Sequence, residues 1–238
     1  VDPPWFNPDR YPGIAFHSRI AAEALPFGDG VFDLVVSLFG IEYARRPLAF
    51  QETCRVCKAT GRHAFVMHHA DSVLARVARE EAGHQAWLLS SDGLIDAAVD
   101  AVPWIALARG GSKAITDARA EVARRRYNEA MSMLKARVAE SRVPDLLIEV
   151  AQWLQRKLVA LQPETAPSTL MALEQARVQL RLAMLRTEEL IIHAMGPDDV
   201  QAIAEIFRSR RTDAQVAISE IAQDGALLAW GVQVAGGR

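Results

Sequence analysis

Two adjacent histidines stand out as side chains whose type and spacing could do chemistry. His68 and His69 are followed, after one residue, by Asp71. A histidine held by an orienting partner can serve as a general base. The same side chains could instead bind a metal, although neighbouring residues of an extended segment point to opposite faces. In the third interpretation one histidine packs, while the other hydrogen-bonds Asp71 or a helix cap.

Glu42 and Tyr43 form a second group of candidates, and they follow directly after an apolar run. A carboxylate at this place can take a proton from a hydroxyl or an amine, and the tyrosine beside it can contact a substrate. The structural alternative for Glu42 is an acidic residue in the first turn of a helix, where it favours the helix dipole.

The two cysteines, Cys54 and Cys57, form a C-x-x-C pattern. Because no second pair is present, a four-cysteine zinc site is excluded, and no metal is expected. A thioredoxin-like redox pair remains as one interpretation. The other is a pair of reduced, mostly buried thiols in a cytosolic protein.

Charge and composition exclude several classes of partner. The chain has 238 residues, a formal net charge of −2 and 50% hydrophobic residues, which is ordinary for a globular domain. Such a small charge gives no strong attraction to nucleic acid or to an anionic membrane. No apolar stretch reaches the roughly 18 residues that a spanning helix needs, and no signal peptide is visible. We therefore expect a cytoplasmic protein with no nucleic-acid or membrane partner.

Three short apolar runs, at 14–17, 31–38 and 63–67, are the first elements that could position these side chains. Such runs between turn signals predict strands that are buried on both faces of a parallel sheet. Residues 47–58 between the second and third runs have the pattern of a crossover helix, which completes a βαβ unit. Both groups of candidates then follow the carboxyl end of a strand.

The middle of the chain is predicted to be helical. Residues 71–195 are almost free of strand signals and predict four or five helices, with caps at 71–72 and 90–92, Pro144 in a first turn, and Gly196 as the final stop. Their Met and Leu stripes predict a packed core.

After this helical block come a helix from 197 to 210 and two strands, 215–221 and 226–234. An Asp-Gly turn at 224–225 makes these strands a hairpin. The expected domains are thus 1–70, a partial cofactor-binding α/β domain; 71–195, a helical insertion; and 196–238, which completes the α/β domain.

Two segments resemble a known family. Residues 22–43, A-E-A-L-P-F-G-D-G-V-F-D-L-V-V-S-L-F-G-I-E-Y, resemble the A-E-x-L-P-F-x-D-x-x-F-D-x-V-x-S segment of class I S-adenosylmethionine (SAM)-dependent methyltransferases of the type 11 subgroup. Residues 52–62, E-T-C-R-V-C-K-A-T-G-R, resemble the E-x-x-R-V-L-K-P-G-G-R segment of the same family. Cys57 stands where that family has leucine. The resemblance therefore favours a core position and argues against the redox interpretation.

The resemblance implies a Rossmann-like α/β sheet, parallel with an antiparallel final strand, and SAM as the cofactor. The family's glycine-rich turn is absent, so the chain is interpreted as an amino-terminally truncated form. The family's acidic ribose ligand corresponds to Asp2. Ala21 stands where the family often has the aspartate that binds adenine. The residues that would contact the cofactor are Asp2, Ala22, Glu23, Ser37, Leu38 and Phe39.

The function that the resemblance implies is methyl transfer from SAM to oxygen, nitrogen or carbon of a small-molecule acceptor. Its catalytic candidates are Glu42, Tyr43, His68 and His69. The helical insertion would shape the substrate pocket as a lid, or pair with a second subunit in a homodimer. The first alternative is an inactive methyltransferase-like protein whose helical block is an interaction module, as Ala21 and the altered turn at 59–60 suggest. The second, an NAD-dependent oxidoreductase, is opposed by the final hairpin and by the lack of a dinucleotide fingerprint.

Overall fold

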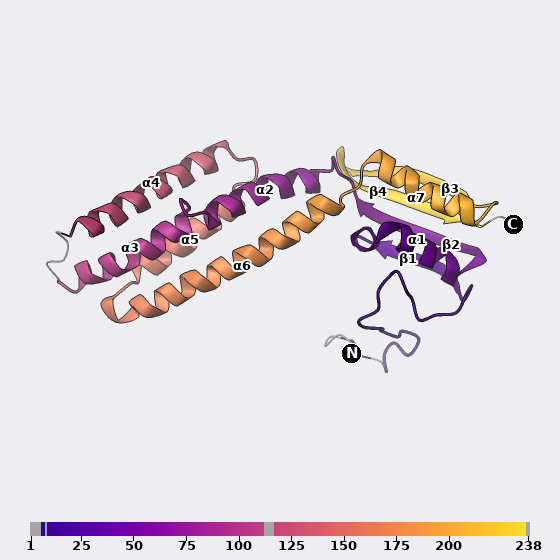
Figure 1. Ribbon diagram of the computed structural model, residues 1–238, viewed down its shortest axis with the longest axis horizontal. Helices are drawn as coiled ribbons and strands as arrows, with labels where there is room; N and C mark the ends of the chain where they lie inside the picture. Colours follow the sequence, from indigo (N-terminus) through magenta and orange to yellow (C-terminus); the bar gives the residue numbers. More distant parts are fainter. Residues whose placement is uncertain (1–5, 8, 112–116, 237–238) are drawn as a thin grey trace. The chain divides into compact units, whose positions relative to one another are not determined.

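The computed structural model describes residues 6–7, 9–111 and 117–236, and its ribbon is drawn in Figure 1. The chain divides into two compact units. Val1–Val73 together with His193–Arg238 form the first, which we call the sheet unit, and Leu74–Ile192 form the second, the helical unit.

The sheet unit contains one four-stranded mixed sheet. Its elements are β1 (Phe32–Leu38), the 3-10 helix η1 (Ile41–Tyr43), α1 (Arg46–Val56), β2 (Cys57–His68), α7 (Pro197–Arg210), β3 (Gln215–Gln223) and β4 (Ala226–Ala235). The strand order is β1-β2-β4-β3. β1 and β2 are parallel, whereas β4 is antiparallel to both of its neighbours. The predicted mixed α/β class and the antiparallel final strand are therefore confirmed.

Helices α1 and α7 cover one face of this sheet. Phe50 of α1, Phe65 of β2 and Phe207 of α7 are all buried there, with the ring centroids of Phe50 and Phe65 5.3 Å apart. On the opposite face of β1, the side chains of Leu34, Val36 and Leu38 are 55%, 65% and 71% exposed. The prediction of strands buried on both faces is thus wrong for β1 among the described residues, because α1 and α7 both pack on the same face.

The predicted strand at 14–17 is absent, since the described residues 9–30 contain only turns, bends and irregular backbone. Ile14 and Phe16 are 51% and 38% exposed. A four-residue apolar run carries too little periodicity to separate a strand from a loop. By contrast, β2 is longer than predicted and begins at Cys57.

Gly61 allows β2 to approach β1 closely. A Cβ atom at this position would lie 2.6 Å from Cys57 Sγ and 3.0 Å from the carbonyl oxygen of Asp33. The pairing of β1 with β2 also shifts register between Phe32 and Leu34. Gly61 therefore serves a close approach inside the strand, whereas the sequence had suggested a turn before it.

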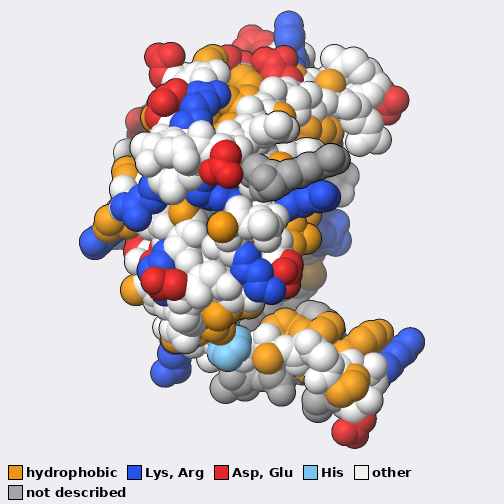
Figure 2. Space-filling model, turned by 90° about the vertical axis from the view of Figure 1, so that its right-hand side faces the viewer, with side chains coloured by type: hydrophobic (Ala, Val, Ile, Leu, Met, Phe, Trp, Pro, Cys, Tyr) orange, Lys and Arg blue, Asp and Glu red, His pale blue; other side chains and the backbone are white. Residues whose placement is uncertain are grey.

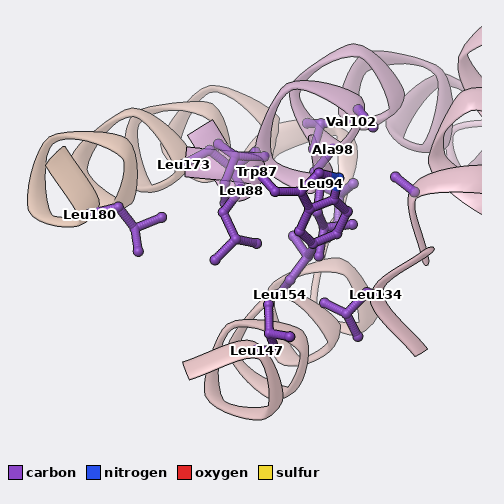
Figure 3. Packing of buried hydrophobic residues seen from close by; sticks show 14 residues of the cluster. Trp87, Leu88, Leu94, Ala98, Val102, Leu134, Leu147, Leu154, Leu173 and Leu180 are labelled. Atoms are coloured by element: carbon purple, nitrogen blue, oxygen red, sulfur yellow. The ribbon is translucent and has the colours of Figure 1, made fainter. Parts of the chain in front are cut away.

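The helical unit consists of α2 (Val73–Leu89), α3 (Leu94–Arg109), α4 (Ala118–Glu140), α5 (Asp145–Val159) and α6 (Ala166–His193). Each helix contributes at least one almost fully buried leucine to a common core: Leu88, Leu94, Leu134, Leu154 and Leu173. Figure 3 shows these side chains converging. Among the described residues, no helix is both long and apolar enough to cross a membrane.

Two predicted helix ends are wrong. The residue before α3 is Gly93, which makes no side-chain cap, and a Cβ there would lie 2.1 Å from the carbonyl oxygen of Trp87. The expected cap at 90–92 is thus replaced by a turn that is too tight for a side chain. Gly196 begins α7 and does not end α6. The chain must leave helix α6 earlier because the Met195 N–H donates to the His68 carbonyl oxygen at 2.8 Å.

Helix α6 exposes apolar side chains at a spacing of seven residues. Met171, Val178, Leu185 and Ile192 are 65%, 45%, 55% and 66% exposed. This stripe lies on the surface of the helical unit, where the sequence had predicted core packing. The homodimer through the helical insertion stays a prediction, and this stripe is the surface on which to test it.

Candidate functional site

The candidate site lies where the two parallel strands end. Leu38 of β1 is paired with Val66 of β2, and the Phe39 N–H donates to the Val66 carbonyl oxygen at 2.8 Å. Since parallel strands end at the same edge of a sheet, residues 39–43 and His68 come together there. The structure therefore brings together Phe39, Glu42, Tyr43 and His68.

Glu42 and His68 form a buried hydrogen-bonded pair. Glu42 is 0% exposed, and its Oε1 accepts from the backbone N–H of His68 at 3.1 Å and from His68 Nδ1 at 2.8 Å. A carboxylate only accepts hydrogen bonds, so Nδ1 carries the hydrogen and the lone pair of a neutral ring lies on Nε2. Glu42 Oε2 is also buried and has no partner among the described residues.

Two aromatic rings flank the imidazole of His68. The ring centroid of Phe39 lies 4.6 Å from it, and that of Tyr43 lies 5.9 Å from it at nearly a right angle. Phe39 has a φ of +51°, a left-handed conformation that costs a non-glycine residue about 1 kcal/mol. The Ile41 N–H donates to Ser37 Oγ at 3.0 Å and helps to hold this tight turn. Backbone strain and a buried hydrogen-bonded pair thus coincide at the sheet edge.

Arg46, at the start of α1, connects this edge to α7. Its guanidinium forms an ion pair with Asp199 at 2.9 Å and donates to the His193 carbonyl oxygen at 3.3 Å. The ring of His193 in turn lies 5.2 Å from that of Tyr43. No sequence pattern links Arg46 to a residue about 150 positions away, so only the fold reveals this support.

His69 points away from the Glu42 pair. It stacks on Trp230 with centroids 4.3 Å apart, and its Nδ1 accepts from the Asp71 N–H at 2.9 Å. The nearest carboxylate oxygen, on Glu220, is 3.5 Å from His69 Nε2. The two histidines therefore face different surroundings, as expected of neighbours in an extended segment.

The predicted cofactor contacts divide into three groups. Asp2 lies outside the described residues. Glu23 Oε1 accepts from the Arg45 N–H at 2.7 Å, and this hydrogen bond lowers the pKa of Glu23. Its carboxylate therefore anchors the loop to the start of α1. Ala22, Ser37 and Phe39 are half-buried and Leu38 is exposed at the end of β1.

One guanidinium joins the two segments that carry the family resemblance. Arg55 of α1 forms a two-pronged pair with Glu52 and donates to the carbonyl oxygens of Leu25 and Phe27 at 3.1 and 2.8 Å. Glu52 also accepts from the Leu25 N–H at 2.8 Å. The pair with Arg55 lowers the pKa of Glu52. The E-x-x-R pattern thus holds the L-P-F loop against the sheet unit.

The cysteines are structural. Both are free thiols, and burial raises the pKa of Cys54 to about 11 and also raises the pKa of Cys57. Since the thiolate is the reactive form, neither position favours redox chemistry. The interpretation of Cys57 as a core position is confirmed by its burial, whereas Cys54 is half-buried.

In the described part of the chain, no potential metal cluster competes with this site. No three potential ligands among His, Cys, Asp and Glu gather there. On the face drawn in Figure 2, acidic and basic side chains alternate over the surface.

A known protein family is similar to the segment that carries most of the candidate site. Residues 12–65 match the family model described as a methyltransferase domain. The match includes β1, η1, α1 and most of β2, and so it contains residues 37–43 and ends just before His68. No curated protein and no solved structure matches the chain.

Proposed function

We propose that this chain, whose residues 12–65 match the model of a methyltransferase domain, is a class I SAM-dependent methyltransferase and transfers a methyl group from SAM to a small-molecule acceptor. The observation that carries the proposal is the position of residues 37–43. They lie within the matched segment and at the carboxyl edge of two parallel strands, where open α/β sheets bind ligands.

The residues at the end of β1 fit part of SAM. Leu38 is 71% exposed and Phe39 is half-buried, so together they offer an apolar surface to the adenosyl group. Glu23 fits less well because its carboxylate already accepts from the Arg45 N–H. We therefore assign SAM contact to Ala22, Ser37, Leu38 and Phe39. When bound, SAM supplies an electrophilic methyl group on a sulfonium.

The acceptor side of the proposed site is formed by Glu42, Tyr43 and His68. Holding an acceptor in line with the methyl group contributes much of the rate of such a transfer. His69 has a supporting role in this proposal, since its ring stacks on Trp230 and its Nδ1 accepts from the Asp71 N–H.

The helical unit is proposed to set acceptor choice. The chain leaves the sheet unit after Val73 and returns at His193, and close to these two connections His69 and Met195 form a parallel bridge beside the candidate site. Both connections thus lie at the edge where the acceptor would bind. Segments inserted at such an edge commonly exclude water and select substrates.

Calorimetry on the full-length protein tests SAM binding. We expect saturable binding of SAM, and at least a ten-fold weaker affinity for Leu38→Asp, because a carboxylate would replace the apolar surface. Leu185→Asp makes the same change on an exposed leucine of α6 and should leave the affinity unchanged. Absence of SAM binding to the wild-type protein would refute the proposal.

The second candidate is an inactive methyltransferase-like protein. It is favoured by the engaged carboxylate of Glu23 and by Ala21, which has no polar side chain for adenine. Formation of S-adenosylhomocysteine from SAM with a cellular metabolite pool would exclude it. Normal SAM affinity without any turnover would support it instead.

A further inference from the structure

Three of the histidine–carboxylate pairs in the described part of the chain differ in distance and burial. His68 Nδ1 lies 2.8 Å from Glu42, whereas the closest approaches of His69 to Glu220 and of His84 to Glu80 are 3.5 and 3.9 Å. The side chain of Glu42 is 0% exposed, while those of Glu220 and Glu80 are 59% and 31% exposed. Of these three pairs, the one between His68 and Glu42 combines a hydrogen bond with complete burial of the carboxylate.

The carboxylate of Glu80 is already used for structure. It accepts from the hydroxyl of Ser141 and from the backbone N–H groups of Arg142 and Val143, so it holds the turn after α4. The Glu42 carboxylate, by contrast, binds only His68, through the backbone N–H and the ring. This double contact fixes the ring orientation as well as its tautomer.

The remaining ring nitrogen of His68 is available. Nε2 makes no hydrogen bond to any described residue, and the side chain keeps 10% of its surface exposed between Phe39 and Tyr43. The other charged or titratable side chains near the pair are Tyr43 of η1, Arg46 of α1, and His193, whose ring contacts that of Tyr43. None of these is placed as a hydrogen-bond partner of Nε2.

We infer that His68 is the general base of the methyl transfer, that Glu42 is its positioning residue, and that the acceptor atom is a hydroxyl oxygen. This inference rests on the proposed function. As the oxygen–methyl bond forms, the sulfur–methyl bond breaks and its electron pair goes to sulfur. The hydroxyl proton passes to His68 Nε2, and the Glu42 carboxylate stabilises the imidazolium until water removes that proton.

A hydroxyl acceptor fits this base better than an amine does. A neutral amine carries a nucleophilic lone pair and can lose its proton to water after the transfer. A hydroxyl oxygen is a weak nucleophile until its proton leaves, so it gains most from a general base in place. A buried carboxylate that fixes the tautomer of one imidazole therefore points to an O–H group.

The tautomer can be measured without turnover. In nitrogen-15 spectra of the imidazole groups of the full-length protein, recorded without SAM, we expect His68 to be protonated on Nδ1 and bare on Nε2. The signal is assigned by its loss in His68→Gln. Observation of the Nε2–H tautomer would overturn the inference, whatever the activity of the enzyme.

The rates test the two roles separately. We expect His68→Gln to lower kcat by about 10²–10⁴-fold, the usual share of general acid–base catalysis, and Glu42→Gln to lower it by about ten-fold or more, with SAM affinity retained in both. Glu220→Gln is the matched control beside His69 and should stay within about two-fold of wild type. Added imidazole should restore part of the activity of His68→Gly. Unchanged kcat in His68→Gln would overturn the assignment.

The acceptor atom is identified by labelling. Trideuteromethyl SAM is supplied with a cellular metabolite extract, and the labelled product is analysed by mass spectrometry and NMR. A methoxy product supports the inference, whereas a label on nitrogen or carbon overturns it. If SAM is neither bound nor consumed, the proposed function fails, and the tautomer measurement still decides the geometry of the pair.

Discussion

The sheet unit and the helical unit bury different kinds of side chain. The core of the helical unit is made mainly of leucines and alanines from five helices, and the buried polar residues in its described part are His84, Gln85 and Thr169. In the sheet unit the described buried polar residues are Glu42, Thr53, His63, His68, His69 and Ser72. Helices satisfy most of their backbone groups internally, whereas strand ends need side-chain partners. Glu42, His68, His69 and Ser72 lie at or just after the carboxyl ends of β1 and β2, so chemistry becomes available there.

The largest effect is expected in the leucine core. Leu154→Ala should lower the free energy of unfolding of the helical unit by about 2–5 kcal/mol, because it leaves a cavity at a residue that is 0% exposed. Urea unfolding followed by tryptophan fluorescence measures it. Leu185→Ala is the matched control, since that side chain is 55% exposed and should cost far less. Equal losses of unfolding free energy in the two variants would contradict the placement of Leu154 in the core.

Acid should weaken the sheet unit through His63. Burial lowers the pKa of His63 to about 4 from its ordinary value of 6.5, and the neutral ring hydrogen-bonds the Thr53 carbonyl oxygen through Nε2. The unfolded chain therefore binds the proton first. Stability is complete above pH 6.5 and falls as the pH drops toward 4, by about 3 kcal/mol at most.

Unfolding free energies of wild type and His63→Gln at several pH values between 7 and 4 measure this contribution. The variant should lose stability at neutral pH but show a shallower decline in acid. If both proteins decline in parallel, His63 is not the group responsible.

The thiol of Cys54 should react slowly. A pKa of about 11, against an ordinary value of 9.0, leaves about 100-fold less thiolate at pH 8, so alkylation by iodoacetamide should slow by about that factor. Mass spectrometry follows the labelling. Unfolding in urea should restore the ordinary rate, and rapid labelling of the folded protein would contradict the burial of this position.

The smallest effect concerns the loop that carries the L-P-F motif. Arg55→Lys keeps the charge but loses the planar fork that binds Glu52, Leu25 and Phe27 together. Chymotrypsin should then cut after Phe27 several-fold faster than in wild type. Arg62→Lys, at an exposed position of β2, serves as the control. Equal cleavage rates would show that the clamp does not order this loop.

Local patterns predicted most of the elements. The turn at Asp224-Gly225 has φ values of +52° and +78°, as an Asp-Gly hairpin requires. Strand β1, helix α1 and the five helices of the middle block follow from apolar spacing and turn residues. The strand at 14–17 and the ends at 90–92 and 196 were predicted wrongly, because a short run or a single glycine is compatible with several structures.

The sequence by itself determined the resemblance of residues 12–65 to a methyltransferase domain and the edge of the sheet at which the candidates gather. Those properties rest on local motifs and on the rule that parallel strands end together. Only the tertiary structure decided that His68 pairs with Glu42, that His69 stacks on Trp230, and that one face of β1 stays open. The reason is physical: each partner comes from a separate segment, and no local periodicity encodes which side chains meet when strands and helices pack.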